Sequence, residues 1–405
     1  MTTPPPPAPK VVRLGIDVLA AGDFKELEGK RVGLLTNQSG VNRKGVSTID
    51  VLRAAANVKL VALYGPEHGV YGAQYAGLSV ATAVDDRTGL PTFSLYGDTK
   101  KPTPEMLQGI DVMVFDIQDI GSRSYTFIAT MALAMEACGE AGKEFVVLDR
   151  PNPIGGNRVE GMPLDPKVLA LDLKARSLVG NLPVPYVHGM TVGELAQMIA
   201  GEGWIKAVPP KVTVIPMKGW KREMVWKETN LAWVPPSPHI PTPESAFGYA
   251  LTGFWGDIPG LSNGVGYTMP FGLMGGTGID RYAFQKGMEG RKLAGMLFIP
   301  ALFKPFYGDL KGQMLQGIQV VCADPAKANL VATAMGLIEE IQTEAGHEVL
   351  SSMGRNDADL FDKICGGDTV RLHFIARKPT ADLIASWQPF LDDFRVRREK
   401  YLLYK

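Results

Sequence analysis

Cysteine and histidine are scarce in this sequence of 405 residues, which contains three cysteines and five histidines. The cysteines, Cys138, Cys322 and Cys365, are far apart and form no Cys-x-x-Cys pair. The sequence also has no His-Glu-x-x-His motif, so neither a disulfide framework nor a zinc site is indicated. We expect buried free thiols, because free cysteine behaves as a small hydrophobic residue.

An excess of charge is absent too, since 42 lysines and arginines balance 42 aspartates and glutamates. Nucleic acids and anionic membranes attract proteins with a basic surface, so the composition argues against both partners. No run of about 18 apolar residues is present, and we therefore expect no transmembrane segment. The sequence gives no indication of oligomeric state.

Signatures of several enzyme classes are missing. The first expected strand is not followed by Gly-x-Gly-x-x-Gly, and no Walker lysine follows a glycine-rich loop, so we expect no nucleotide cofactor. No Gly-x-Ser-x-Gly elbow marks a hydrolase serine. We expect no cofactor and no bound metal. A magnesium site built from Glu67, Asp116 and Asp119 remains an alternative, because hard cations take oxygen ligands.

The first ten residues, MTTPPPPAPK, are rich in proline and lack the apolar core of a signal peptide. We expect residues 1–10 to form an extended, disordered leader. Such a start fits a cytoplasmic protein, and it equally fits the remainder of a chain whose export signal has been removed.

The N-terminal part alternates short apolar runs with helical stretches, which predicts a parallel sheet with helices on both faces, a Rossmann-like α/β fold. The apolar run before Asp116 is nearly continuous, as in strands buried on both faces. A Thr191-x-x-Glu194 capping box predicts a helix start. The expected strands cover residues 31–36, 59–64, 111–115, 144–148 and 211–215, and the expected helices cover 47–57, 126–141 and the run from 195 to 199.

The C-terminal part differs in character. Residues 234–243 contain five prolines and cannot form a regular element, so we place the domain boundary there. We expect a catalytic domain over 11–243 and a smaller α+β domain over 244–405. In the smaller domain, glycine-rich loops are expected over 253–278, a strand over 317–321, and helices over 326–346 and 381–394.

Polar side chains follow four of the expected strands. In open α/β sheets, ligands bind in the crevice beyond the carboxyl ends of the strands, so we expect a binding site there. These strand ends supply the candidate substrate-binding residues Asn37, His68, Gln118, Arg123, Tyr125, Arg150 and Asn152, to which we add His188.

Glu67 is the leading catalytic candidate, because Pro66 and Gly69 sharpen the turn that follows a buried strand. Partial burial disfavours the ionised form of a carboxyl group, which suits an acid catalyst. A carboxylate bonded only to backbone N–H groups is the alternative. Asp116 and Asp119 are candidates for a second carboxyl group, although Asp116 could instead bond Arg123 or a helix N-terminus.

The ionic partner of Arg150 is a separate question. Asp149 precedes it directly in the sequence, and we expect these two residues to form a structural ion pair that joins two loops.

Seven segments together resemble the peptidoglycan exo-β-N-acetylmuramidase family, whose members are called NamZ-like. They keep their order between Val32 and Thr242, and they read GLLTNQSG, YGPEHG, DIQDIGSRSYTFIATM, DRPNPIGG, HGMTVGELA, GWKREMVWKET and WVPPSPHIPT.

The resemblance implies a Rossmann-like domain with a smaller C-terminal domain that completes a cleft. It implies release of terminal N-acetylmuramic acid from the non-reducing end of a muropeptide or amino-sugar disaccharide, with Glu67 as the catalytic glutamate. It also implies a periplasmic or extracellular location. A non-catalytic protein that binds cell-wall fragments is the rival hypothesis.

The sequence departs from the family pattern at three places. Tyr71 stands where arginine is usual, and residues 256–259 and 262–266 lack two glutamates and an arginine that the family usually carries. The exact sugar and the retention of activity therefore stay open.

Overall fold

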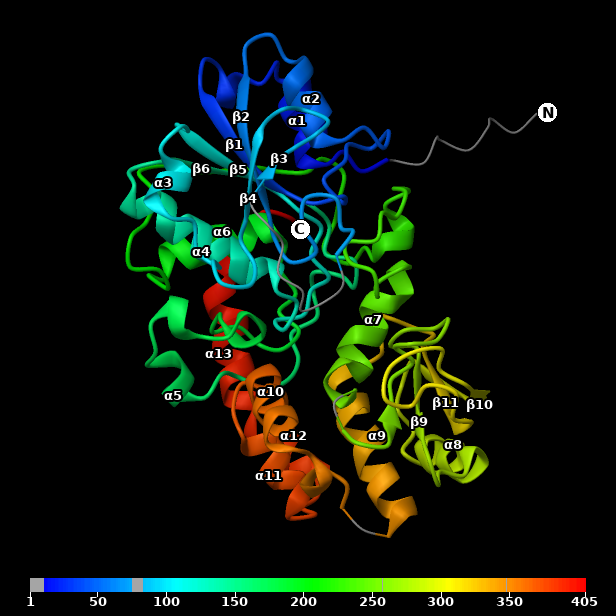
Figure 1. Ribbon diagram of the computed structural model, residues 1–405. Helices are drawn as coiled ribbons and strands as arrows, with labels where there is room; N and C mark the ends of the chain where they lie inside the picture. Colours follow the sequence, from blue (N-terminus) through cyan, green and yellow to red (C-terminus); the bar gives the residue numbers. More distant parts are fainter. Residues whose placement is uncertain (1–10, 75–82, 257, 347) are drawn as a thin grey trace, which may run out of the picture.

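The computed structural model describes residues 11–74, 83–256, 258–346 and 348–405, so the proline-rich leader lies outside the described residues. The N-terminal part contains a seven-stranded sheet in which six strands are parallel and the short edge strand β3 is antiparallel (Figure 1). The strands are β1 (Arg31–Thr36), β2 (Lys59–Gly65), β3 (Ala83–Val84), β4 (Pro91–Ser94), β5 (Val112–Asp116), β6 (Glu144–Leu148) and β7 (Val212–Ile215).

The parallel strands follow the order β4-β2-β1-β5-β6-β7, which is the doubly wound order of a Rossmann fold. The direction of strand addition reverses between β1 and β5, where Thr36 pairs with Asp116. Polar residues at the carboxyl ends of β1 and β5 therefore lie at the topological switch point, where such sheets bind ligands. The expected Rossmann-like α/β fold is confirmed.

Strand β5 shows why the sheet needs helices on both faces, since all five of its residues are buried. Val112 and Val114 pack in a cluster with α1 and α2, whereas Met113 and Phe115 pack in the cluster that contains α4 and α6. Successive strand residues point to opposite faces, so a continuous apolar run is required. The helices of this part are α1 (Gly15–Ala21), α2 (Thr48–Ala54), α3 (Pro104–Leu107), α4 (Phe127–Glu140), α5 (Pro166–Leu169) and α6 (Val192–Gly201).

Helix α6 begins as its sequence predicts. The Thr191 hydroxyl accepts a hydrogen bond from the Glu194 N–H, and the Glu194 carboxylate accepts one from the Thr191 N–H, which completes the capping box.

The C-terminal part contains a four-stranded antiparallel sheet of order β10-β11-β9-β8. Figure 1 shows this sheet beside α7, α8 and α9, and the remaining helices form a separate group. The strands are β8 (Leu261–Ser262), β9 (Leu273–Gly276), β10 (Met296–Phe303) and β11 (Leu315–Cys322). The helices are α7 (Pro243–Thr252), α8 (Arg281–Gly290), α9 (Leu330–Ala345), α10 (Arg355–Cys365), α11 (Thr369–Ile375), α12 (Thr380–Ser386) and α13 (Gln388–Arg398).

Two expectations for this part were wrong. Residues 253–278 are not loops throughout, because β8 and β9 form there from short, glycine-containing segments. The single helix expected over 381–394 is two helices, since Pro389 lies in the first turn of α13, where its missing N–H is tolerated.

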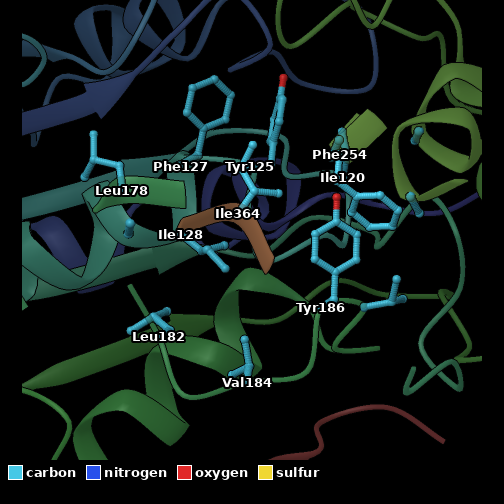
Figure 2. Packing of buried hydrophobic residues seen from close by; sticks show 14 of the residues in the cluster. Ile120, Tyr125, Phe127, Ile128, Leu178, Leu182, Val184, Tyr186, Phe254 and Ile364 are labelled. Atoms are coloured by element: carbon cyan, nitrogen blue, oxygen red, sulfur yellow. The ribbon is translucent and has the colours of Figure 1, made fainter. Parts of the chain in front are cut away.

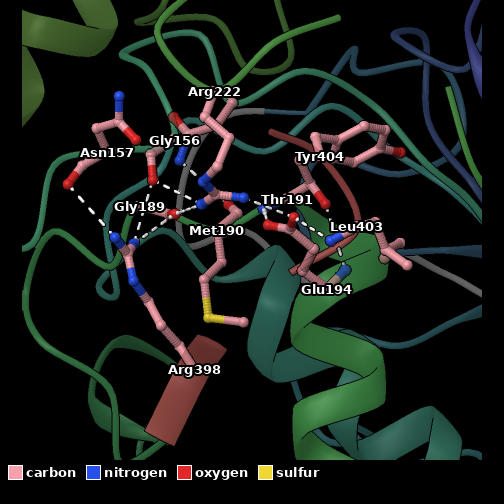
Figure 3. Close-up of polar contacts among 12 residues, drawn as sticks. Gly156, Asn157, Gly189, Met190, Thr191, Glu194, Arg222, Arg398, Leu403 and Tyr404 are labelled. Atoms are coloured by element: carbon pink, nitrogen blue, oxygen red, sulfur yellow. Dashed lines mark hydrogen bonds and ion pairs between the residues drawn. The ribbon is translucent and has the colours of Figure 1, made fainter. Parts of the chain in front are cut away.

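The end of the chain returns to the N-terminal sheet. Arg398 at the end of α13 and Arg222 both donate hydrogen bonds to the carbonyls of Gly156 and Gly189 (Figure 3). Arg222 also pairs with Glu194 at 2.6 Å, and the same carboxylate oxygen accepts the N–H of Leu403. The last residues of the chain are therefore part of the structure that supports α6.

Candidate active site

At the switch point, Asp116 and Arg150 form a buried ion pair. Arg150 Nε and Nη2 lie 2.6 and 3.0 Å from the two carboxylate oxygens, and the Thr48 hydroxyl donates to the same carboxylate. Arg150 also donates to the carbonyl of Val41. Asp116 is completely buried, so these contacts hold α2, β5 and the loop after β6 together. The expected pairing of Arg150 with Asp149 was wrong, because the Arg150 side chain reaches Asp116 instead.

The three candidate amide side chains are buried and bonded to backbone. Asn37 donates to the carbonyl of Pro236 at 3.1 Å, and Asn152 donates to Met190 at 3.1 Å. Gln118 donates to the carbonyls of Asp119 and Pro151. These contacts position loops around the site and leave little of the three side chains for a ligand.

Arg123 is directed into the protein. Its guanidinium donates to the carbonyls of Met162, Val184 and Ile364, and only 1% of the residue is exposed. Burial lowers the pKa of Arg123 to about 10. Because Ile364 belongs to α10, Arg123 ties the C-terminal helices to the loop after β5. We therefore leave Arg123 out of the proposed sugar site.

Glu67 follows β2 and remains partly exposed. Its Oε2 atom accepts a hydrogen bond of 2.9 Å from the hydroxyl of Thr126. Thr126 directly precedes α4, yet its side chain does not cap that helix. Burial and the neighbouring charge of Glu67 raise the pKa of the Tyr96 phenol. Two hydroxyl-bearing side chains therefore orient a carboxyl group that solvent can still reach.

The turn after Glu67 places His68 at a φ of 71°, a conformation that few residues other than glycine adopt. Its Nδ1 atom lies 2.8 Å from the carbonyl of Gln74, which fixes the ring within this turn. His239, in the proline-rich segment, is close enough for His68 to lower its pKa, although burial is the larger cause.

Asp119 lies beside His188 in the loop region after β5. Its Oδ2 atom accepts the N–H of Gly121 at 2.7 Å and lies 3.7 Å from His188 Nε2. The N–H of Met190 donates to His188 Nδ1, so the ring proton of a neutral His188 is on Nε2, facing Asp119. Both side chains are buried.

Tyr125 connects the two carboxyl groups electrostatically. Burial raises the pKa of its phenol, and the charges of Asp119 and Glu67 act in the same direction, whereas Ser237 acts against them. Figure 2 shows the ring beside the apolar cluster, with the hydroxyl directed away from the labelled side chains. Of the predicted residues, the structure thus gathers Glu67, Asp119, Tyr125 and His188 around one phenol.

Several residues of this site were missed from the sequence. Thr126, Tyr96, Ser237 and His239 are among them, and His239 Nε2 lies 2.7 Å from the hydroxyl of Tyr307 in the C-terminal part. Thr126, Ser237 and His239 all lie within the segments that carry the family resemblance, which was the available signal. Tyr96 lies in none of those segments.

A cavity of about 400 Å³ lies between the two parts of the chain, with a mostly apolar lining. It is bounded by Trp226, by α7 residues such as Phe247, and by Met269 and Val320. Glu67 and Asp119 do not line it, so it does not contain the proposed acid.

Among the described residues, no three histidine, cysteine, aspartate or glutamate side chains are arranged to hold a metal ion. Over the same part of the chain, no helix has the length and apolar character needed to cross a bilayer.

Comparison with known sequences gives two matches to family profiles. Residues 32–244 match the N-terminal domain of the exo-β-N-acetylmuramidase NamZ, and residues 247–404 match its C-terminal domain. The peptidoglycan β-N-acetylmuramidase NamZ of Bacillus subtilis (strain 168) is 42% identical over 397 residues, which cover 97% of this chain and 91% of that protein.

Two solved structures from Bacteroides fragilis NCTC 9343 have the same fold, and both are described as DUF1343 family proteins. The first (BF0371) has a TM-score of 0.91 at 44% identity, and the alignment covers 97% of this chain and 99% of that one. The second (BF0379) has a TM-score of 0.73 at 27% identity with the same coverage.

Proposed function

Because this chain belongs to the NamZ exo-β-N-acetylmuramidase family and is a glycosidase, we propose that it releases terminal N-acetylmuramic acid from peptidoglycan fragments. The bond cleaved is the one at the non-reducing end, and a related amino sugar is the variant of this proposal that the changed family positions leave open. Since the substrate derives from the cell wall, we place the enzyme in the periplasm or outside the cell.

The geometry of Glu67 supports its assignment as the general acid. An acid catalyst needs a carboxyl group that is reachable by substrate and held in one orientation. Glu67 is partly exposed, and the Thr126 hydroxyl holds Oε2 at 2.9 Å. Asp119 is the second carboxyl group of the site, as glycosidases typically require two. Asp116 is unsuited to that part, because Arg150 and Thr48 occupy both of its oxygens.

The side chains proposed to contact the sugar are Tyr125 and His188. Asn37, Gln118, Arg150 and Asn152 act at one remove, by positioning loops. Neither Arg123 nor Arg150 is available for the lactyl carboxylate of muramic acid, because each is committed to protein partners.

The experiment is hydrolysis of aryl β-N-acetylmuramides by the full chain. Glu67→Gln should lower kcat/KM about 100- to 10,000-fold, the usual contribution of a positioned acid. The loss should be greatest for poor leaving groups, since dinitrophenol departs without protonation. Glu105→Gln, at an exposed glutamate of α3, is the matched control and should behave as the wild type.

Three results would contradict the proposal. The first is an equal loss of rate for good and poor leaving groups in Glu67→Gln. The second is binding of muropeptides without release of sugar. The third is abolition of hydrolysis by a chelator, which would indicate the metal-dependent alternative.

A further inference from the structure

Three buried polar atoms beside Glu67 have no protein partner with hydrogen-bond geometry among the described residues. They are Asp119 Oδ1, the Tyr125 hydroxyl and His188 Nε2, and each residue is less than 9% exposed. Buried polar atoms in folded proteins are nearly always hydrogen-bonded, so such a group needs an explanation. All three residues lie at the site that contains the proposed acid, which points to a bound polar group as the missing partner.

We propose that Asp119 and Tyr125 bind the 2-acetamido group of the amino sugar, and that the acetamido oxygen attacks the anomeric carbon. This inference rests on the proposed function and adds the identity of the nucleophile. Asp119 then stabilises the attacking group and makes no covalent bond to the sugar.

The donors and acceptors match an acetamido group. The amide N–H needs an acceptor, and Asp119 Oδ1 is one, because Gly121 and His188 engage only Oδ2. The amide carbonyl needs a donor, and the Tyr125 hydroxyl supplies it. The methyl group needs apolar surface, which the rings of Phe127 and Tyr249 offer at 4.8 and 5.8 Å from the Tyr125 ring.

His188 is a positioning residue in this arrangement. It is completely buried, and the Met190 N–H fixes its Nδ1 as an acceptor. Its Nε2 proton therefore faces Asp119 Oδ2 at 3.7 Å, which favours the ionised carboxylate and holds its orientation. An ionised Asp119 is what a developing positive charge on the acetamido nitrogen requires.

The reaction then proceeds in two balanced steps. In the first, Glu67 gives its proton to the glycosidic oxygen, the bond from C1 to that oxygen breaks, and the acetamido oxygen bonds to C1. The leaving sugar departs as an alcohol, and an oxazolinium ring remains. In the second, water adds to C1 and loses a proton to Glu67, while the bond from C1 to the ring oxygen breaks. One water is consumed, Glu67 is protonated again, and the configuration at C1 is retained.

The test compares aryl β-muramides whose N-acetyl group carries none to three fluorine atoms. Fluorine withdraws electrons from the carbonyl oxygen, so kcat/KM should fall at each step, by about 100-fold over the series. The first product detected by NMR should be the β-anomer. A flat series with the β-anomer would overturn the inference in favour of attack by Asp119. A flat series with the α-anomer would overturn it in favour of direct attack by water.

Binding of a muramic-acid thiazoline, a stable mimic of the ring intermediate, gives a readout that does not need turnover. Asp119→Asn and Tyr125→Phe should weaken binding by about tenfold or more, the effect of one lost hydrogen bond to a charged or polar partner. Tyr186→Phe, at another buried tyrosine of the cluster, should bind as the wild type. His188→Gln should bind more weakly yet keep the dependence on fluorine. Equal binding by wild type and Asp119→Asn would contradict the inference.

The two failures are distinguishable. If the wild type does not hydrolyse the unfluorinated substrate, both the proposed function and this inference fall. If it hydrolyses the whole series at one rate, only this inference falls.

Discussion

The hydroxyl of Tyr404, next to last in the chain, donates a hydrogen bond of 2.5 Å to Asp149, which follows β6. The same hydroxyl accepts the N–H of Met217 at 2.9 Å, and the ring packs edge-on against Trp220. Asp149 in turn accepts bonds from the Thr191 hydroxyl and the Gly193 N–H at the start of α6. The end of the chain therefore completes the hydrogen bonding at one end of the Rossmann-like sheet.

Removing this hydroxyl should destabilise the whole protein. Tyr404→Phe keeps the ring contact but leaves the Met217 N–H without its partner, which should lower the free energy of unfolding by about 1–3 kcal/mol. Urea unfolding followed by tryptophan fluorescence measures this change. Tyr401→Phe is the matched control, because its hydroxyl bonds Glu202 in a partly exposed position and should matter less. Equal stability of Tyr404→Phe and the wild type would contradict the prediction.

Asp149 should make stability depend on pH. Burial raises its pKa from 3.8 to about 7, although its hydrogen bonds act in the opposite direction. Between about pH 4 and pH 7 the folded chain therefore binds more protons at this site than the unfolded chain, and the contribution to stability falls as pH rises. Asp149→Asn lacks this titration. The stability of the wild type minus that of the variant should shrink by at most about 4 kcal/mol over this range.

Urea unfolding at pH 4.5, 6 and 7.5 tests this expectation. Other titrating groups are common to both proteins and cancel in the difference. A stability difference that stays constant across the three pH values would show that Asp149 is ionised throughout.

The ion pair of Asp116 and Arg150 should be needed for stability and not for chemistry. Asp116→Asn leaves a buried guanidinium without its charge partner, which should lower the free energy of unfolding by about 3–5 kcal/mol. Asp111→Asn breaks the largely exposed pair with Arg31 and should cost less than about 1 kcal/mol. At a temperature where Asp116→Asn remains folded, its kcat should stay near that of the wild type. A fully stable Asp116→Asn that has lost hydrolysis would instead identify Asp116 as catalytic.

The sequence predicted the elements whose apolar pattern is strong. β5 is an uninterrupted buried run, and α6 carries its own capping box. β3 and β4 were not expected, because two or four residues at the sheet edge, beginning in one case with Pro91, give no periodic signal. Short local patterns thus predict central strands better than edge strands.

For the site, residue types were predicted better than partners. Arg150 was expected to bond its sequence neighbour, yet it reaches an aspartate 34 residues away. Arg123 looked like a ligand-binding arginine, but its carbonyl partners come from three separate segments. Such partners depend on the tertiary fold, so no reading of local sequence supplies them.

Asn37 should affect hydrolysis through the proline-rich segment that it holds. Its amide donates to the carbonyl of Pro236, and its oxygen accepts the N–H and hydroxyl of Ser39. Ser237 and His239 follow directly in that segment, and Ser237 acts on the Tyr125 phenol. The Asn37 side chain is buried, so the lost donor cannot be replaced by water.

Asn37→Asp keeps the acceptors for Ser39 but places a carboxylate against the Pro236 carbonyl, which should release the segment. We expect kcat/KM to fall about tenfold, by the loss of one buried hydrogen bond that positions the site. Hydrogen exchange of the peptide covering 231–245 should become faster in the same variant. Gln38→Glu is the matched control, since Gln38 donates to the neighbouring Pro235 carbonyl from a more exposed position. If Asn37→Asp slows hydrolysis while exchange in 231–245 is unchanged, Asn37 contacts the substrate itself, and its assignment as a loop-positioning residue is wrong.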